Sequence, residues 1–345
     1  MRVAIRGGAM GDVLLGIPAW RALRDVAPFV PFVACAPTAV ASLVRVSLEM
    51  PSGPGPLGET ASRRPPVVVI TPDDPAIASL HAVGAPSASA AIPAWDAVDV
   101  AVAWTRSHRE IVARLRAAGV ARPIGADPFP PAGARIHAAD WLAATLGEVG
   151  AAVAPDWDAV PWLRVPPDAG VTGCLEGDDR PEAILHPGSG SRRKWWPADR
   201  WRAVVEALLE AGWRVTVLEG APDGEIVAAV LQGDGVPAAW AGRVTVVRGE
   251  AVASVAARLA GASLVLSNDS GIAHLAAGLG APVVAAFGPT DPAIWRPRGP
   301  RVAVLGGTPG STWPHAGGAP PADVTWPIVG AMVEAIRSVV PEVRG

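Results

Sequence analysis

Lysine is almost absent from this chain of 345 residues: Lys194 is the single lysine among 29 basic residues, and the others are arginine. Tyrosine is missing altogether, whereas tryptophan occurs 14 times, twice beside that lysine at Trp195 and Trp196. Most tryptophans are expected in the core, although this pair could stack on a sugar or a base. Lysine is a compact point charge and arginine a planar fork of donors, so the surroundings of this one ammonium group are informative.

The chain also has few cysteines, a small net charge and no long apolar run, and each of these features excludes a class of protein. Cys35 and Cys174 lie far apart in apolar stretches, which argues against a disulfide framework or a metal site and favours a reducing cytoplasm. A net charge of −3 gives no basic surface for nucleic acid, so local groups must hold any anionic ligand. No apolar run is as long as a membrane span, and the N-terminus leads directly into a strand rather than a signal peptide.

Short apolar strands alternate with amphipathic helices along the whole chain. The first half predicts strands at 2–6, 30–34, 66–71 and 98–104 and helices at 12–26, 37–48, 107–118 and 136–148. After a Pro- and Asp-rich connection at 155–181, strands at 183–186, 214–219, 244–248, 263–267 and 282–287 alternate with helices near 198–211, 223–232, 251–260 and 271–279. The pattern predicts an α/β protein with two Rossmann-like domains facing a central cleft. Their expected bounds are 1–160 and 161–325, with a last helix in 326–345 packing back on the first domain.

Lys194 follows a predicted strand in the segment His186–Pro197, which contains Ser189. A loop between a strand and a helix is where an α/β protein places phosphate-binding side chains. The alternative is a chance lysine on a solvated basic surface.

Asp12 stands between the first strand and the first helix, after a glycine-containing loop that includes Gly11. Glycines there let a ligand approach the backbone, and the helix N-terminus offers unpaired N–H groups. The spacing departs from a full dinucleotide fingerprint. Asp12 can be the N-cap of the helix or a general base facing a bound hydroxyl, and local sequence leaves both roles open.

A second constellation spans Asp269, Ser270, Gly271 and His274, where another strand meets a helix. Ser270 and the N–H groups that follow it can take a phosphate at the positive helix end. His274, one turn further on, can point back to the same ligand or be structural. Glu219 ends a neighbouring strand, where a carboxylate suits ribose hydroxyls; its alternative is a solvated loop position.

The chain resembles glycosyltransferase family 9, whose best-known members are ADP-heptose:lipopolysaccharide heptosyltransferases. The resemblance is carried by Gly-Ala-Met-Gly-Asp-Val-Leu-Leu (8–15), by His-Pro-Gly-Ser-Gly-Ser with Lys-x-Trp-Pro (186–197) and by Ser-Asn-Asp-Ser-Gly-Ile-Ala-His-Leu-Ala-Ala with Phe-Gly-Pro-Thr-Asp-Pro (267–292). The segment from His137 to Gly147 is similar to the helix that closes the family's first domain.

The resemblance implies a GT-B fold with the acceptor on the first domain and a nucleotide sugar, ADP-heptose, on the second. By that likeness Asp12 is the catalytic base and Lys194 neutralises the diphosphate. Glu219 holds the ribose, while the donor-binding set is completed by Gly11, Ser189, Asp269, Ser270, Gly271 and His274. The expected reaction is inverting, with no cofactor and no metal. No Asp-x-Asp is expected to serve as a metal clamp, and the Asp178–Asp179 pair lies in a polar linker.

Acceptor recognition is less clear from the sequence. Arg106, His108 and Arg109 follow a strand and are the candidate acceptor site for a saccharide or glycolipid such as lipopolysaccharide core; they could equally form a solvated helical turn.

The protein is expected in the cytoplasm. A peripheral contact with the inner membrane through Trp20, Arg21 and Arg24 of the first helix is a further possibility. A nucleotide-sugar epimerase on the same fold and a non-catalytic sugar-nucleotide binding module are the alternatives, but the former lacks acid/base candidates beyond His274.

Overall fold

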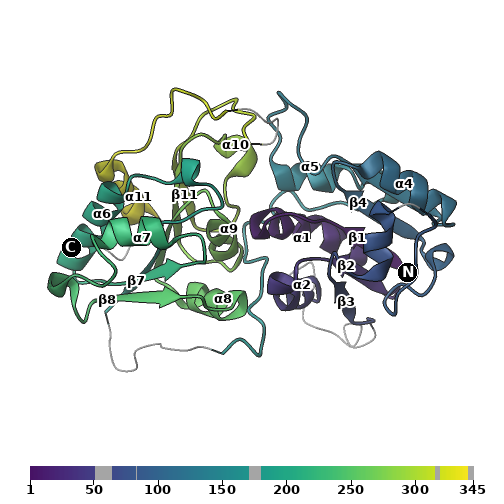
Figure 1. Cartoon of the computed structure of the whole chain (residues 1–345), viewed down its shortest axis with the longest axis horizontal. Helices are drawn as coiled ribbons and strands as arrows, with labels where there is room; N and C mark the ends of the chain where they lie inside the picture. Colours follow the sequence, from purple (N-terminus) through teal and green to yellow (C-terminus); the bar gives the residue numbers. More distant parts are fainter. Residues whose placement is uncertain (51–63, 83, 171–179, 315–318, 341–345) are drawn as a thin grey trace. The chain divides into compact units, whose positions relative to one another are not determined.

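The fold is that of a computed structural model, which describes residues 1–50, 64–82, 84–170, 180–314 and 319–340. The chain divides into two compact units, Met1–Trp157 and Asp158–Gly345 (Figure 1). The division falls three residues before the predicted boundary at 160. Cys174, Asp178 and Asp179 lie outside the described residues, as does most of the predicted loop at 51–66.

The first unit is a doubly wound α/β domain. Its parallel sheet has the order β3-β2-β1-β4-β5. The strands are β1 (Arg2–Ile5), β2 (Phe32–Cys35), β3 (Val67–Ile70), β4 (Val100–Trp104) and β5 (Arg122–Ala126), and the helices are α1 (Met10–Asp25), α2 (Ala41–Leu48), α3 (Pro75–Ala78), α4 (His108–Ala117) and α5 (Ala138–Ala144). Strands β1, β2 and β4 are buried along their whole length, which explains their uninterrupted apolar sequences.

The second unit repeats this architecture with six parallel strands in the order β11-β10-β9-β6-β7-β8. The strands are β6 (Glu182–His186), β7 (Arg214–Glu219), β8 (Val244–Arg248), β9 (Leu264–Asn268), β10 (Val283–Phe287) and β11 (Val302–Gly306). The helices are α6 (Ala198–Glu210), α7 (Gly224–Leu231), α8 (Val252–Gly261), α9 (Gly271–Gly278), α10 (Pro292–Trp295) and α11 (Val329–Val339). The predicted pair of Rossmann-like domains is therefore confirmed.

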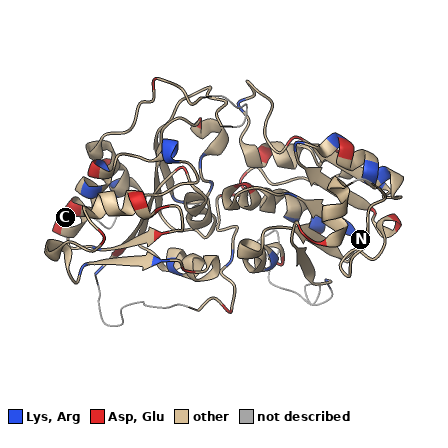
Figure 2. Ribbon diagram, viewed as in Figure 1, with Lys and Arg blue, Asp and Glu red and all other residues tan. Residues whose placement is uncertain are grey.

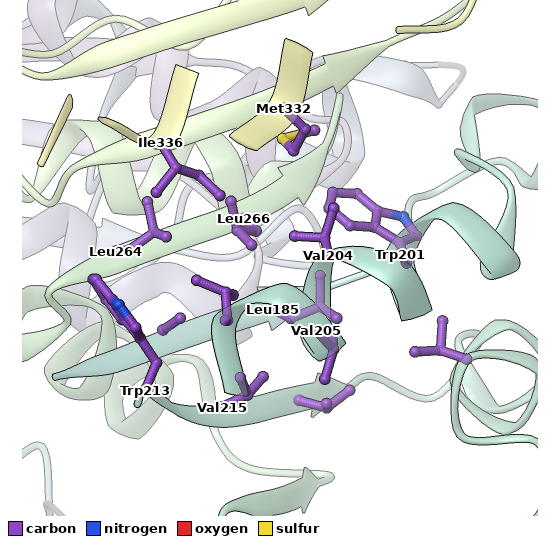
Figure 3. Close-up of a cluster of buried hydrophobic side chains, with 14 of the residues drawn as sticks. Leu185, Trp201, Val204, Val205, Trp213, Val215, Leu264, Leu266, Met332 and Ile336 are labelled. Atoms are coloured by element: carbon purple, nitrogen blue, oxygen red, sulfur yellow. The ribbon is translucent and has the colours of Figure 1, made fainter. Parts of the chain in front are cut away.

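The last helix belongs to the second unit, which corrects the expectation that it packs on the first domain. Met332 and Ile336 of α11 lie over the sheet residues Leu264 and Leu266 in one buried cluster (Figure 3). Together with Ala335 and Val339 they form an apolar stripe at helical spacing, and this stripe covers strands of the second sheet. The same cluster holds Trp196, Trp201, Trp213 and Trp240, so these tryptophans pack in the core.

The proposed membrane-binding residues of α1 are turned into the first unit. Trp20 is fully buried, and Arg24 is buried with Nη1 donating to the carbonyl of Leu48 at 2.6 Å. Arg21 donates to the carbonyl of Ser47 at 2.7 Å. Arg21 and Arg24 thus hold α1 against α2, and the burial of Trp20 and Arg24 argues against a membrane contact through those two side chains. Within the described ranges, no helix is both long and apolar enough to cross a bilayer.

Candidate functional site

The topology of the second unit marks one place on its sheet edge. From β6 the chain winds through β7 and β8 on one side, and later through β9, β10 and β11 on the other. The loops that leave the carboxyl ends of β6 and β9 therefore diverge, and such a switch point is where open α/β sheets bind ligands. Both predicted motifs of this unit lie there.

Lys194 and Asp269 form an ion pair at this switch point. Lys194 lies in a 3₁₀ turn after β6, and its Nζ is 2.8 Å from Asp269 Oδ2, directly after β9. Thr290 Oγ1 donates to the same carboxylate oxygen at 2.7 Å. The carboxylate is buried, whereas the side chain of Lys194 is 19% exposed and has three ammonium protons. Lys194 can therefore keep Asp269 and still donate to a ligand.

Neighbouring side chains hold the two loops in place. Asn268 accepts from the backbone N–H of Trp196 at 3.0 Å and donates to the carbonyl of Pro187. Ser189 Oγ donates to the carbonyl of Asp269 at 2.8 Å. Ser189 was predicted to bind the donor, but its hydroxyl donates its proton to the backbone carbonyl of Asp269. Its contribution is to fix the geometry of the Lys194–Asp269 pair.

Helix α9 begins at Gly271, as predicted, with Ser270 as its N-cap. Ser270 Oγ accepts from the backbone N–H of Ala273 at 3.4 Å. The first N–H groups of the helix therefore follow directly after Asp269 and the end of β9. A helix N-terminus carries a partial positive charge and suits an anion.

His274 lies in the first turns of α9 and is buried. Burial lowers the pKa of His274 to about 4, with the nearby Asp269 carboxylate opposing the change and Lys194 adding to it. Its Nδ1 has no hydrogen-bond partner among the residues that the structure describes. The imidazole is neutral at physiological pH, so it acts as a polar group and not as a cation.

Glu219 ends β7, as predicted, at the same edge of the sheet. Its Oε2 accepts from Arg248 Nε of β8 at 2.9 Å. Because its side chain is 19% exposed, the carboxylate is neither buried nor freely solvated. The structure thus assembles Lys194, Ser189, Asp269, Ser270 and His274, and it places Glu219 one strand away beside an arginine.

Two residues of the second unit were missed by sequence reasoning as functional candidates. His186, the last residue of β6, lies with Nε2 3.1 Å from Asp223 Oδ2, and both side chains are buried. Asp223 also accepts from the backbone N–H of Gly220 at 3.0 Å. The available signal was a pair of glycines: a Cβ on Gly188 would lie 2.0 Å from Asp223 Oδ1, and one on Gly220 would lie 2.8 Å from Oδ2.

Gly188→Ala should therefore destabilise the second unit by about 1–3 kcal/mol, because the methyl group must displace a buried carboxylate. Gly190→Ala is the matched control: a Cβ there meets no atom within 4 Å, and we expect a change within about 0.5 kcal/mol. Urea denaturation followed by tryptophan fluorescence measures both. Equal stability of the two variants would contradict the close approach of Gly188 to Asp223.

The candidate base Asp12 lies at the corresponding edge of the first sheet. Helix α1 begins at Met10 with Ala9 as its N-cap, which rules out the N-cap alternative for Asp12. Asp12 is the third helical residue, and its Oδ2 accepts from the backbone N–H of Ala9 at 3.2 Å. Gly11 lies beside it in the same turn. Gly8 has φ +119, and a Cβ there would approach Asp12 Oδ2 to 2.9 Å, so the loop requires glycine.

Arg6 supports this turn and was also missed. Its side chain is fully buried, with Nε donating to the backbone carbonyl of Asp12 at 2.6 Å and Nη1 to that of Pro128 at 3.1 Å. Burial lowers the pKa of Arg6 to about 10, while the charge of Asp12 opposes that change. The signal in the sequence was an arginine directly after the apolar residues Val3–Ile5 of β1.

The predicted acceptor residues follow β4, which is the neighbour of β1 at the switch point of the first sheet. Arg106 lies over the ring of Phe129, 5.6 Å from its centroid, and His108 Nδ1 is 3.0 Å from the carbonyl of Thr105. Arg109, the second residue of α4, is exposed. The loop carrying these residues and the loop carrying Asp12 thus leave adjacent strands. Within the described residues, no group of three or more His, Cys, Asp or Glu side chains could hold a metal ion.

Comparison with known proteins gives independent information on the second unit. The model of glycosyltransferase family 9 (heptosyltransferase) matches residues 167–313. Lipopolysaccharide heptosyltransferase 1 of Escherichia coli K12 is 37% identical over 101 residues. This match spans 29% of the chain and only 30% of that relative.

Solved structures extend the likeness of fold to the whole chain. A glycosyl transferase family 9 structure from Veillonella parvula DSM 2008 has a TM-score of 0.65 at 17% identity, covering 99% of this chain and 97% of that one. The E. coli heptosyltransferase WaaC with ADP has a TM-score of 0.59 at 20% identity, covering 98% and 99%. The predicted resemblance is confirmed: the chain is similar to glycosyltransferase family 9 in sequence over residues 167–313 and has the GT-B fold of two parallel-sheet α/β domains.

Proposed function

We propose that this protein is a glycosyltransferase that moves heptose from an ADP-linked donor to a hydroxyl of a lipopolysaccharide core saccharide. The observation that carries the proposal is the meeting of Lys194 with the N-terminus of α9 at the switch point of the second sheet. A cation beside unpaired backbone N–H groups suits a diphosphate. The family match covers this same region, and the heptosyltransferase names of the matched relatives support the choice of sugar.

In this proposal the second unit holds the donor. Lys194 and the first N–H groups of α9, at Gly271, neutralise the diphosphate. Asp269 holds Lys194 in place through their ion pair. Glu219 accepts hydrogen bonds from the ribose hydroxyls, which weakens its ion pair with Arg248. His274, being neutral, offers a polar contact to the donor without repelling Lys194.

The first unit supplies the base and the acceptor site. Asp12 takes the proton of the acceptor hydroxyl as its oxygen attacks the anomeric carbon, and the bond from that carbon to the diphosphate breaks. The configuration inverts because the attack and the departure occur on opposite faces. Positive groups, with no metal or other cofactor, stabilise the charge that grows on the leaving diphosphate. Arg106, His108 and Arg109 would bind the anionic acceptor, which the protein meets on the cytoplasmic side of the inner membrane.

Calorimetric titration with ADP, UDP and GDP tests the donor site. We expect selective binding of ADP, weakened at least about tenfold in Lys194→Ala, because a charge-assisted hydrogen bond to phosphate contributes about 1.5–3 kcal/mol. Arg193→Ala is the control, since Arg193 is exposed in the same turn. Preference for UDP or GDP would keep the transferase proposal but change the donor. If none of the three nucleotides binds, the proposed function is wrong.

A further inference from the structure

A chain of hydrogen bonds runs through the buried side of the second-unit site. Asp223 Oδ2 lies 3.1 Å from His186 Nε2. On the other side of the ring, His186 Nδ1 lies 3.4 Å from Ser270 Oγ, which is 2.8 Å from Ser267 Oγ. All four side chains expose less than a tenth of their surface. The chain of bonds thus links the ends of β6 and β9 and the turn before α7, underneath the proposed diphosphate site.

Counting protons fixes the direction of these bonds. A carboxylate only accepts hydrogen bonds, so when His186 is in its neutral form, its proton lies on Nε2 and is donated to Asp223. Nδ1 is then an acceptor. If Ser267 donates to Ser270 and Ser270 donates to His186 Nδ1, then the two hydroxyls and Nδ1 each have a hydrogen-bond partner. Ser270 Oγ also accepts from the backbone N–H of Ala273. The one proton of the Ser270 hydroxyl is therefore directed into the protein and is not available to a phosphate.

We propose that binding of the donor diphosphate is coupled to the uptake of one proton by His186, an inference that rests on the proposed function. Protonated His186 donates from both ring nitrogens, to Asp223 and to Ser270 Oγ. Ser270 Oγ then accepts from His186 and Ser267, in place of its 3.4 Å bond from the N–H of Ala273, and turns its own proton outward to a phosphate oxygen. The proton comes from the solvent, and no covalent bond other than the N–H bond forms or breaks. His186 is thus a positioning residue, which acts on the ligand through Ser270.

The charges around His186 favour this coupling. Asp223 Oδ1 has no hydrogen-bond partner within the described part of the chain, so the carboxylate retains capacity to stabilise an imidazolium. A bound diphosphate adds negative charge above the ring and favours the same form. The other titratable or charged groups on the surrounding loops include the paired Lys194 and Asp269, neutral His274, Glu219 paired with Arg248, Glu225 paired with Arg192, and the exposed Arg193. The ion pairs largely offset their own charges, which leaves Asp223 and the ligand as the dominant influences.

The linkage is measured by titrating ADP-glucose calorimetrically near neutral pH in buffers of different ionisation enthalpy, such as PIPES and Tris. A diphosphate diester does not titrate in this range, so any proton exchanged belongs to the protein. The observed enthalpy should vary with the buffer enthalpy, with a slope that reports uptake of up to one proton. A wild-type enthalpy that is the same in both buffers would overturn the proposal.

Three variants separate this linkage from a structural role. His186→Gln keeps a donor and an acceptor but cannot be protonated, so it should bind about tenfold more weakly and with no buffer dependence. Asp223→Asn should reduce the proton uptake, and Ser270→Ala should remove it while leaving the N–H groups of α9. Unchanged proton uptake in His186→Gln or Ser270→Ala contradicts the mechanism. If neither ADP nor ADP-glucose binds to wild type, the proposed function fails and this inference with it.

Discussion

An Asp12→Asn variant should lose sugar transfer by about 10²–10⁴-fold, because a carboxamide cannot accept the proton of the acceptor hydroxyl. Nucleotide binding should be unchanged, since the proposed diphosphate ligands belong to residues of the second unit. The fold should also be unchanged: an asparagine Oδ1 can still accept from the N–H of Ala9, as the carboxylate does. Transfer is measured as release of ADP from ADP-heptose in the presence of a lipopolysaccharide core acceptor.

The matched control for this variant is Asp25→Asn, at the other end of α1. Asp25 pairs with Arg64 at 2.8 Å and has no role in the proposed chemistry. It should transfer at the wild-type rate. Undiminished transfer by Asp12→Asn would contradict the role of Asp12 as base, whatever the nucleotide binding.

The stability of the second unit should fall in mild acid because of His274. The unfolded chain binds a proton at this residue near pH 6.5, whereas the folded protein does so only near pH 4. Below pH 6.5 the unfolded state therefore gains the proton first, so the contribution of neutral His274 is complete above that pH and is lost as the pH falls to about 4. The pKa of His274 thus differs by about 2.5 between the unfolded and the folded state. At about 1.4 kcal/mol for each pKa unit, this lowers the free energy of unfolding in acid by about 3 kcal/mol.

Urea denaturation of wild type and of His274→Gln over this pH range measures the effect. The glutamine variant does not titrate, so its free energy of unfolding should fall by about 3 kcal/mol less than that of wild type between pH 7 and pH 4. Parallel pH dependences in the two proteins would show that His274 is not held neutral by burial.

The sequence predicted the α/β alternation well, and the errors have physical causes. Strands β7 and β8 were predicted with their observed bounds, because each is an apolar run closed by charged residues. Two strands were missed, β5 and β11, and both lie at an edge of their sheet. Strand β5 contains Pro123 and Gly125 and is only partly buried, so it lacks the apolar signal of a central strand.

The site was predictable where a single loop carries it and unpredictable where distant segments meet. Lys194 and Ser270 were found because each follows a strand in an α/β pattern. The start of the first helix was predicted two residues late, at 12 instead of Met10, because the N-cap Ala9 has no capping side chain to mark it. Arg6 and the His186–Asp223 pair depend on contacts between separate segments of the chain. Local patterns carry no signal for such contacts, apart from the glycines that make room for them.

The placement of the C-terminal segment has a consequence for the order in which the protein is made. Trp196, two residues after Lys194, donates from Nε1 to the carbonyl of Pro327 at 3.0 Å, and Trp326 occupies the space that a Cβ on Gly288 would need. The residues of the first unit leave the ribosome early and in one continuous stretch, so that unit can fold during synthesis. The loop that presents Lys194 gains its last support only after residues 326–339 have been added. A nascent chain therefore completes its first unit well before the loop around Lys194 has all of its supporting contacts.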